Sequence, residues 1–116
     1  MSQYYNIGEL KAIKPSASGT SSVLTQPNVS CSEAWILAQA GINNNGALNV
    51  YLTDEYGRRL SDTIETSSSQ ISRLKFTSVK IDASEFPSVI RVVAENRSTV
   101  TNSNAYIQGL LLVYDS

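Results

Sequence analysis

The chain contains no histidine, and this absence limits the chemistry that its other reactive residues could perform. Serine and cysteine nucleophiles are commonly activated by a histidine base, so Ser–His and Cys–His pairs are excluded here. Histidine ligands for a metal ion are excluded as well. The single cysteine, Cys31, cannot form an intramolecular disulfide, and we interpret it as a small, partly buried apolar residue.

Carboxylates are the next candidates for chemistry, and they form two neighbouring pairs, Asp54 with Glu55 and Asp82 with Glu85. A glycosidase needs two carboxylates that face each other across a substrate, and nothing in this spacing fixes such a pair. Asp54, Glu55 and Asp82 are also the candidates for a structural calcium ion, but no loop has the dense alternation of Asp and Asn that is typical of calcium loops. We therefore interpret the carboxylates as solvated turn residues, and expect no enzyme activity and no cofactor.

Aromatic rings beside polar side chains could form a sugar-binding surface. Trp35, Tyr51, Tyr56 and Tyr106 could supply ring faces, and the three asparagines at 43–45 could supply amides. Alternatively, Trp35 belongs to the core and Tyr51 packs across a pair of strands, as aromatic residues on sheets often do. We favour the core for Trp35 and keep both interpretations for Tyr51 and Tyr56.

Arg58 and Arg59 are the only adjacent basic residues in a chain with nine Lys and Arg, ten Asp and Glu, and a net charge of -1. Phosphate binding needs clustered cations, so we do not expect a nucleic-acid partner. The arginine pair could bind acidic groups on a partner, or could form a solvated face. No apolar run has the length of a membrane-spanning helix, and residues 1–8 lack a signal-peptide pattern, so we expect synthesis in the cytoplasm and no membrane partner.

The elements that must position these residues have the pattern of β-strands. The most apolar segment is 104–115, in which both alternating faces are apolar. One face holds Tyr106, Gln108, Leu110, Leu112 and Tyr114, and the other holds Ala105, Ile107, Gly109, Leu111 and Val113. A strand that faces water on one side should have a polar face, so we expect this strand to be central in a sheet and covered on both sides.

Other strands are expected on either side of turn signals. Asn45–Gly46 predicts a hairpin that pairs 33–42 with 47–53. The turn at 54–57 should lead into a weaker strand at 58–66, and a strand at 88–95 is rich in β-branched residues.

Two segments have less regular patterns. The strand expected at 70–82 changes phase near Thr77 and Ser78, which predicts a β-bulge or a crossing between sheets. Residues 8–14 are expected to form a short strand, although helical spacing is also present, and 16–32 should be mainly loop with a short edge strand at Val23–Leu24.

These elements predict one all-β domain over residues 1–116, an antiparallel β-sandwich of about seven or eight strands, with 1–32 forming an extended N-terminal arm and loop. The segments 76–82, 86–96 and 105–113 are similar to the closing strands of jelly-roll domains. Jelly-roll domains include carbohydrate-binding modules and the small decoration, or cement, proteins of tailed-phage capsids.

The resemblance to decoration proteins implies a non-enzymatic structural protein of the bacteriophage virion. It would form a homotrimer and bind the major capsid protein on the outer surface, and thereby stabilise the shell. The alternative is a carbohydrate-binding module that attaches to host-surface glycans. Tyr4 and Tyr5 would belong to an arm that docks on a neighbouring subunit, or to an edge strand of their own domain. The candidate partner-binding residues are Tyr4, Tyr5, Ile7, Leu10, Val23, Leu24, Tyr51, Tyr56, Arg58 and Arg59.

Overall fold

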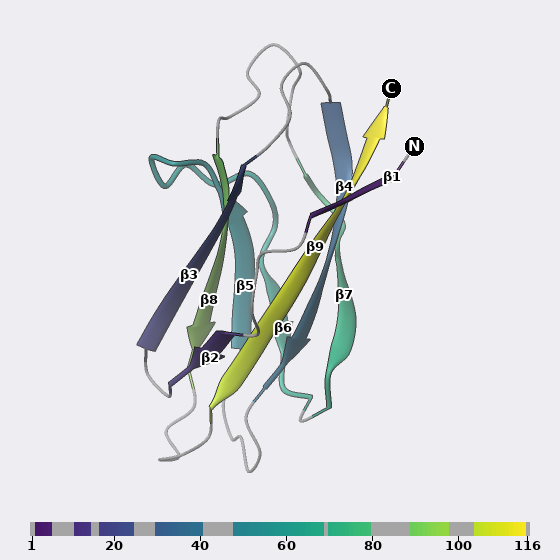
Figure 1. Cartoon of the computed structure of the whole chain (residues 1–116). Coiled ribbons are helices and arrows are strands. Elements are labelled where there is room, and N and C mark those ends of the chain that lie inside the picture. Colours follow the sequence, from purple (N-terminus) through teal and green to yellow (C-terminus); the bar gives the residue numbers. More distant parts are fainter. Residues whose placement is uncertain are drawn as a thin grey trace.

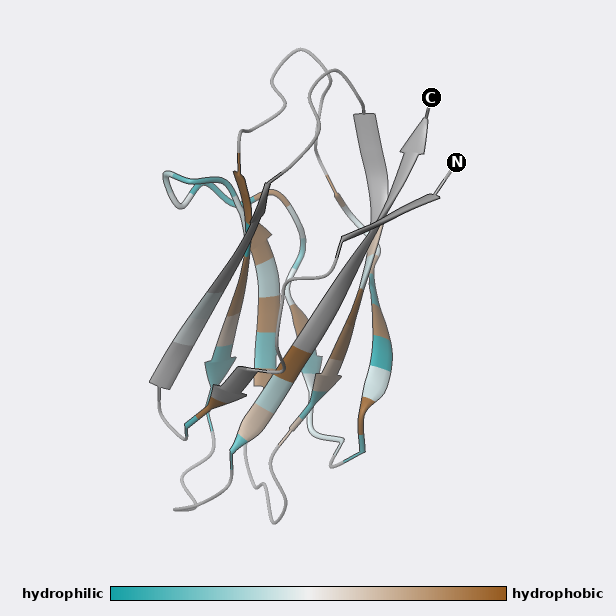
Figure 2. Ribbon diagram, viewed as in Figure 1, coloured by the Kyte–Doolittle hydropathy of each residue, from teal (hydrophilic) through white to brown (hydrophobic). Residues whose placement is uncertain are grey.

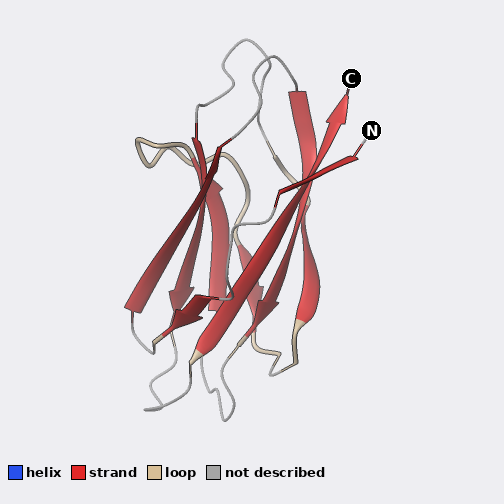
Figure 3. Cartoon of the chain, in the orientation of Figure 1, coloured by secondary structure: helices blue, strands red, loops and turns tan. Residues whose placement is uncertain are grey.

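The computed structural model describes residues 2–5, 11–14, 17–24, 30–40, 48–68, 70–79, 89–97 and 104–115. Within these ranges every regular element is a strand (Figure 3). The strands are β1 (Ser2–Tyr5), β2 (Lys11–Ile13), β3 (Ala17–Leu24), β4 (Ser30–Gln39), β5 (Leu48–Thr53), β6 (Ile64–Thr66), β7 (Ser72–Phe76), β8 (Val89–Asn96) and β9 (Ala105–Asp115). No helix long and apolar enough to cross a membrane occurs in the described ranges.

The strands form two antiparallel sheets that face each other (Figure 1). Sheet A has the order β1-β9-β4-β7, and β2 pairs with the other half of β9; sheet B has the order β3-β8-β5-β6. If β1 and β2 are taken as one interrupted strand, the first strand pairs with the last, the second with the next to last, and so on inward to the pair β5–β6. This rolled-up pairing is the jelly-roll, so the predicted fold class is confirmed.

The core lies between the two sheets, and alternate residues of β4, β5 and β8 are buried in it. Along β5 apolar residues alternate with more polar ones, as the brown and teal bands in Figure 2 show. Along β8 buried residues alternate with half-buried ones. The largest fully buried apolar side chains are Phe76, Ile36, Leu48, Leu52, Ile90, Ile107, Val50 and Val92. The outward residues between them remain available for contacts with other molecules.

Strand β9 is central in sheet A, as predicted, because it pairs with β1 and β2 on one edge and with β4 on the other. Its alternation does not run unbroken, however. Leu37 pairs with Gln108 whereas Ile36 pairs with Leu110, so Gly109 is an extra residue in β9. Such a bulge shifts the alternation by one residue, and the prediction of two continuous faces over 104–115 is therefore wrong.

The hairpin predicted at Asn45–Gly46 is also wrong. Strand β4 pairs with β7 and β9 in sheet A, whereas β5 pairs with β6 and β8 in sheet B. The two strands belong to opposite layers, and the asparagine–glycine turn lies outside the described residues. Turn chemistry is a local preference, and here the burial of both apolar faces in one core between the sheets decides the arrangement.

The N-terminal third contains more strand than predicted. Residues 17–24, expected to be mainly loop, form β3, which pairs with β8 along its whole length. Residues 2–5 and 11–13 are strands at the edge of sheet A rather than an extended arm. The β-branched run of β8 offers a full row of backbone partners, so even a segment rich in serine and threonine is extended there.

The segment after β6 confirms the predicted phase change. Phe76 and Val79 are both buried although they are three residues apart, so the alternation breaks at Thr77 and Ser78. Beyond the break, Val79 forms a bridge with Ser61 instead of continuing along β4. The strand predicted at 58–66 is reduced to β6, preceded by isolated bridges at Arg59 and Ser61.

Candidate functional site

The strongest candidate site lies on the outer face of sheet B, around Tyr51 of β5. Val50 and Leu52 on either side of Tyr51 are fully buried, whereas Tyr51 itself is half-buried and faces outward. The register places Val93 of β8 directly opposite Tyr51. We call this surface the Tyr51 face, and it comprises Asn49, Tyr51, Arg59, Thr63, Arg91 and Glu95.

Three contacts hold the Tyr51 ring and its neighbours in place. The Tyr51 hydroxyl donates a hydrogen bond to Oε1 of Glu95 at 3.1 Å. The guanidinium carbon of Arg59 lies 3.8 Å from the centre of the Tyr51 ring, in the geometry of a cation–π contact. Nη1 of Arg59 also donates to the hydroxyl of Thr63 at 2.7 Å. The Tyr51 ring of β5 thus contacts both a cation from the segment between β5 and β6 and a carboxylate from β8.

Two polar atoms of the same face lack a hydrogen-bond partner. They are Oδ1 of Asn49 and Nε of Arg91, both buried and without a partner among the described residues. Asn49 and Arg91 lie on either side of Tyr51, because Asn49 is two residues before it and Arg91 pairs with Thr53 two residues after it. An unsatisfied buried polar group costs about 1–3 kcal/mol, so a small side-chain movement that exposes these atoms to a ligand would be favoured.

The turn between β5 and β6 adjoins this face and is organised by Asp54. Its Oδ1 accepts hydrogen bonds from the backbone N–H of Tyr56 at 2.9 Å and of Arg58 at 2.8 Å, and its Oδ2 accepts one from Nε of Arg58 at 3.1 Å. Gly57 has a φ of 86°, which only glycine adopts freely. The predicted turn is therefore confirmed, but the interpretation of Asp54 as a solvated residue is wrong because Asp54 is buried.

The hydrogen bonds to Asp54 also change its ionisation. Burial by itself would raise the pKa of this carboxyl, but the backbone N–H groups of Arg58 and Tyr56, together with the charge of Arg58, outweigh burial and hold the pKa below its ordinary value of 3.8. A lowered pKa in the folded state means that ionised Asp54 stabilises the fold above the ordinary pKa. This stabilisation is lost as the pH falls through the lowered pKa.

Replacing Asp54 with alanine should therefore lower the free energy of unfolding at pH 7 by about 2–3 kcal/mol, because the substitution leaves the Tyr56 and Arg58 N–H groups without their acceptor. Asp54→Asn keeps an acceptor oxygen, so it should lower the free energy of unfolding by less than the alanine substitution does. Urea unfolding from pH 7 down to pH 2 measures both effects. The difference in the free energy of unfolding between wild type and Asp54→Asn should narrow below pH 3.8. A difference that stays constant with pH would contradict the role of the charge.

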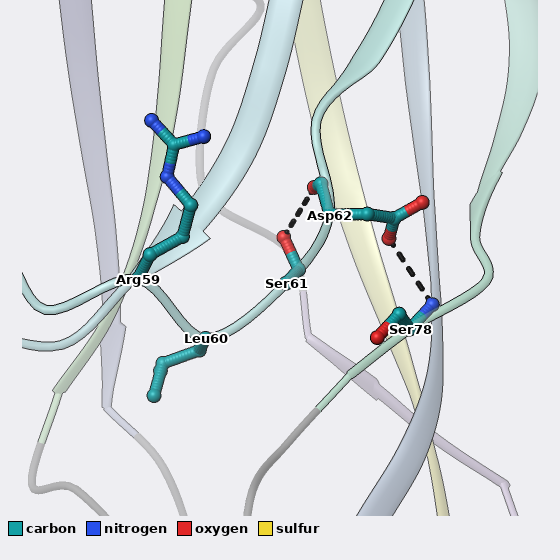
Figure 4. Close-up of a pocket in the computed structure, with 5 residues that line it drawn as sticks. All are labelled: Arg59, Leu60, Ser61, Asp62 and Ser78. Atoms are coloured by element: carbon teal, nitrogen blue, oxygen red, sulfur yellow. Dashed lines mark hydrogen bonds between the residues drawn. The ribbon is translucent and has the colours of Figure 1, made fainter.

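A second carboxylate, Asp62, lines a shallow cavity of about 240 Å³ together with Arg59, Leu60, Ser61 and Ser78 (Figure 4). Asp62 accepts hydrogen bonds from the Ser78 N–H at 3.1 Å and from the Thr77 hydroxyl at 2.9 Å. Burial would raise its pKa, but these bonds lower the pKa overall. The Asp62 carboxylate thus links the segment after β7 to the segment before β6 through hydrogen bonds. Among the described residues no group of three or more His, Cys, Asp or Glu could hold a metal ion.

The structure brings together only part of the predicted site. Tyr51 and Arg59 are in contact. Tyr56 is 87% exposed at the tip of the turn, and Arg58 forms an ion pair with Asp54.

The remaining predicted residues lie elsewhere. Tyr4 and Tyr5 belong to β1 and pair with Leu111 and Leu110 of the same chain, which is the edge-strand interpretation. Val23 and Leu24 pair with Ile90 and Val89 at the end of β3. The other candidates, Ile7 and Leu10, and the asparagines at 43–45 lie outside the described residues.

The prediction for Trp35 is wrong as well. Trp35 is half-buried and faces outward on sheet A, because Ala34 and Ile36 occupy the inward positions of β4. The ammonium of Lys75 lies 5.4 Å from the centre of its ring. Leu37 and Tyr106 are outward and half-buried on the same sheet, so sheet A also has an apolar outer surface.

No model of a protein family matches the chain, and no curated protein matches it. Solved structures resemble it in fold. TmCBM61 in complex with beta-1,4-galactotriose has a TM-score of 0.54 at 12% identity, over 91% of this chain and 69% of its own. A family two carbohydrate esterase from Cellvibrio japonicus has a TM-score of 0.50 at 15% identity, over 99% of this chain and 35% of its own, so this chain spans about a third of the esterase.

A further similarity is to the structure of infectious bursal disease virus Gt strain, with a TM-score of 0.47 at 12% identity, over 97% of this chain and 32% of the viral chain. At such low identities the similarities to TmCBM61 and to the esterase show a shared fold and leave the function open.

Proposed function

We propose that this chain is a non-enzymatic, carbohydrate-binding β-sandwich and that its Tyr51 face is the surface that contacts the glycan. The observation that carries the proposal is the fixed cluster of an aromatic ring, an arginine, an amide and a carboxylate on one outward sheet face. Sugars offer both apolar C–H faces and hydroxyl groups, and such mixed clusters recognise both. The similarity in fold to a carbohydrate-binding module that was solved with a galactotriose supports the proposal.

The contacts available to a sugar differ between the two tyrosines. Arg59 lies over the Tyr51 ring, so a sugar that stacks directly on this ring must displace Arg59. Tyr56, in the adjoining turn, offers a free ring. The proposed ligand therefore stacks on Tyr56 or on the Arg59–Tyr51 pair, and makes hydrogen bonds along the sheet.

Affinity gel electrophoresis of the purified chain through a panel of soluble neutral and acidic polysaccharides tests the proposal. We expect at least one polysaccharide to slow the protein, and the matching free oligosaccharide to reverse the effect. Unchanged migration in every gel, together with no signal on a glycan array, would overturn the proposal.

A second candidate, a decoration protein of the bacteriophage virion that forms a homotrimer on the major capsid protein, is favoured by the outer face of sheet A. Trp35, Leu37 and Tyr106 are outward there, and Ile71, just before β7, is 52% exposed. Such an apolar surface suits a contact between subunits. Because β1 already pairs with β9, this sheet would make the contact rather than a free arm.

Light scattering coupled to size exclusion checks this second candidate. A virion protein of this kind should have three times the 12.6 kDa mass of one chain. Trp35→Ser should reduce the assembly to monomers. A monomeric wild-type chain that does not bind phage capsids would exclude this candidate.

A further inference from the structure

Charge is distributed unevenly along the Tyr51 face, and the register shows how. Asn49 of β5 pairs with a glutamate on each side, Glu95 of β8 and Glu65 of β6. Thr53 of β5 pairs with an arginine on each side, Arg91 of β8 and, through an isolated bridge, Arg59. The face therefore has glutamates beside Asn49, its acidic end, and arginines beside Thr53, its basic end, two backbone positions about 13 Å apart along β5. The guanidinium of Arg59 reaches back from the basic end over the Tyr51 ring.

The basic end has no acidic partner among the described residues. Arg58 forms an ion pair with Asp54. In the part of the chain that the structure describes, the Arg59 side chain contacts the Tyr51 ring and the Thr63 hydroxyl but no carboxylate, and Nε of Arg91 has no hydrogen-bond partner. Guanidinium groups bind carboxylates in a planar, two-pronged geometry that is shorter and stronger than neutral hydrogen bonds. Arg59 and Arg91 lie at one end of the proposed sugar site, and their guanidinium groups have no carboxylate partner among the described residues. They therefore favour a ligand that carries a carboxylate.

The side chains of the acidic end can accept hydrogen bonds from a ligand, and the negative charges of its glutamates repel an anionic group on that ligand. Glu95 accepts a hydrogen bond from Tyr51, and Oδ1 of Asn49 accepts none from the described residues. A carboxylate can accept several hydrogen bonds, so sugar hydroxyls can donate to Glu95 and Asn49. Because Glu65 and Glu95 would repel an anionic group, they set the orientation of an acidic ligand on the face.

We infer that the Tyr51 face binds an acidic saccharide of the uronic-acid class, with its carboxylate at Arg59 and Arg91 and its hydroxyl groups at Asn49 and Glu95. This inference rests on the proposed carbohydrate binding and adds the chemical class of the ligand. It also assigns a role to Arg91, Asn49 and Glu95, which no sequence pattern singled out.

The experiment compares each acidic polymer with its own carboxyl-reduced form, so that only the charge differs. Polygalacturonate, alginate and hyaluronate serve as probes, and dissociation constants come from affinity electrophoresis at low salt. We expect at least one acidic polymer to bind tenfold or more tightly than its reduced form. Arg59→Gln and Arg91→Gln should each remove most of this difference. Arg73→Gln, which removes an exposed arginine from sheet A, should leave it unchanged.

The outcomes separate the two proposals. Equal binding of an acidic polymer and its reduced form would overturn the acidic class and leave carbohydrate binding in place. Binding of neutral polysaccharides alone would do the same. A preference for the acidic form that Arg73→Gln abolishes as fully as Arg59→Gln would show attraction by net charge and overturn the assigned site. Since Arg59 is exposed, its substitution should leave thermal unfolding unchanged even if Arg91→Gln is destabilised.

Discussion

Replacing Phe76 with alanine should lower the free energy of unfolding by about 3–5 kcal/mol, the range for a buried aromatic residue whose removal leaves a cavity. Phe76 is fully buried at the end of β7. Its partner in β4 is Ala34, whose small side chain cannot fill the space. Urea unfolding followed by circular dichroism measures the loss.

The matched control for Phe76 is Ile71, an apolar residue close to the other end of the same strand. Ile71 is 52% exposed, so Ile71→Ala should change the stability by less than about 0.5 kcal/mol. A loss below about 1 kcal/mol for Phe76→Ala would contradict its place in the core. Comparable losses for the two variants would contradict the inward and outward assignment along β7.

The fold class could be predicted because alternation of apolar residues depends on each strand alone. The pairing of strands could not, since partners in a jelly-roll are far apart in the sequence. Asn45 and Gly46 favour a tight turn locally, yet β4 and β5 lie in opposite sheets. Gly109 was a usable signal, because a glycine inside a strand often marks a bulge, and alternation should not be extended through it.

The candidate site has the same dependence on pairing. Tyr51 and Arg59 attract notice in the sequence because aromatic and basic residues are conspicuous there. Glu95 and Arg91 look like the ordinary polar positions of an alternating strand. They gain meaning only because β8 lies beside β5, which puts Glu95 within a hydrogen bond of Tyr51 although the residues are 44 positions apart. Alternation could have placed Arg91, Val93 and Glu95 on one face, but not next to Tyr51.

Tyr51→Ala should weaken glycan binding by about 30-fold or more, equivalent to about 2 kcal/mol, the usual threshold for a central contact residue. The substitution removes the ring on which Arg59 lies and the hydroxyl that donates to Glu95. The side chains of Arg59 and Glu95 therefore both lose the contact with Tyr51 that holds them in place. Tyr51→Phe keeps the ring but removes the hydroxyl, so it should weaken the binding free energy by about 0.5–1.5 kcal/mol, the net value of one hydrogen bond. Tyr106→Ala, which removes a half-buried tyrosine from sheet A, is the control and should bind normally.

If Tyr51→Ala binds like wild type while Tyr56→Ala does not, the glycan contacts the turn and not the sheet. If Tyr106→Ala alone loses binding, the glycan surface belongs to sheet A.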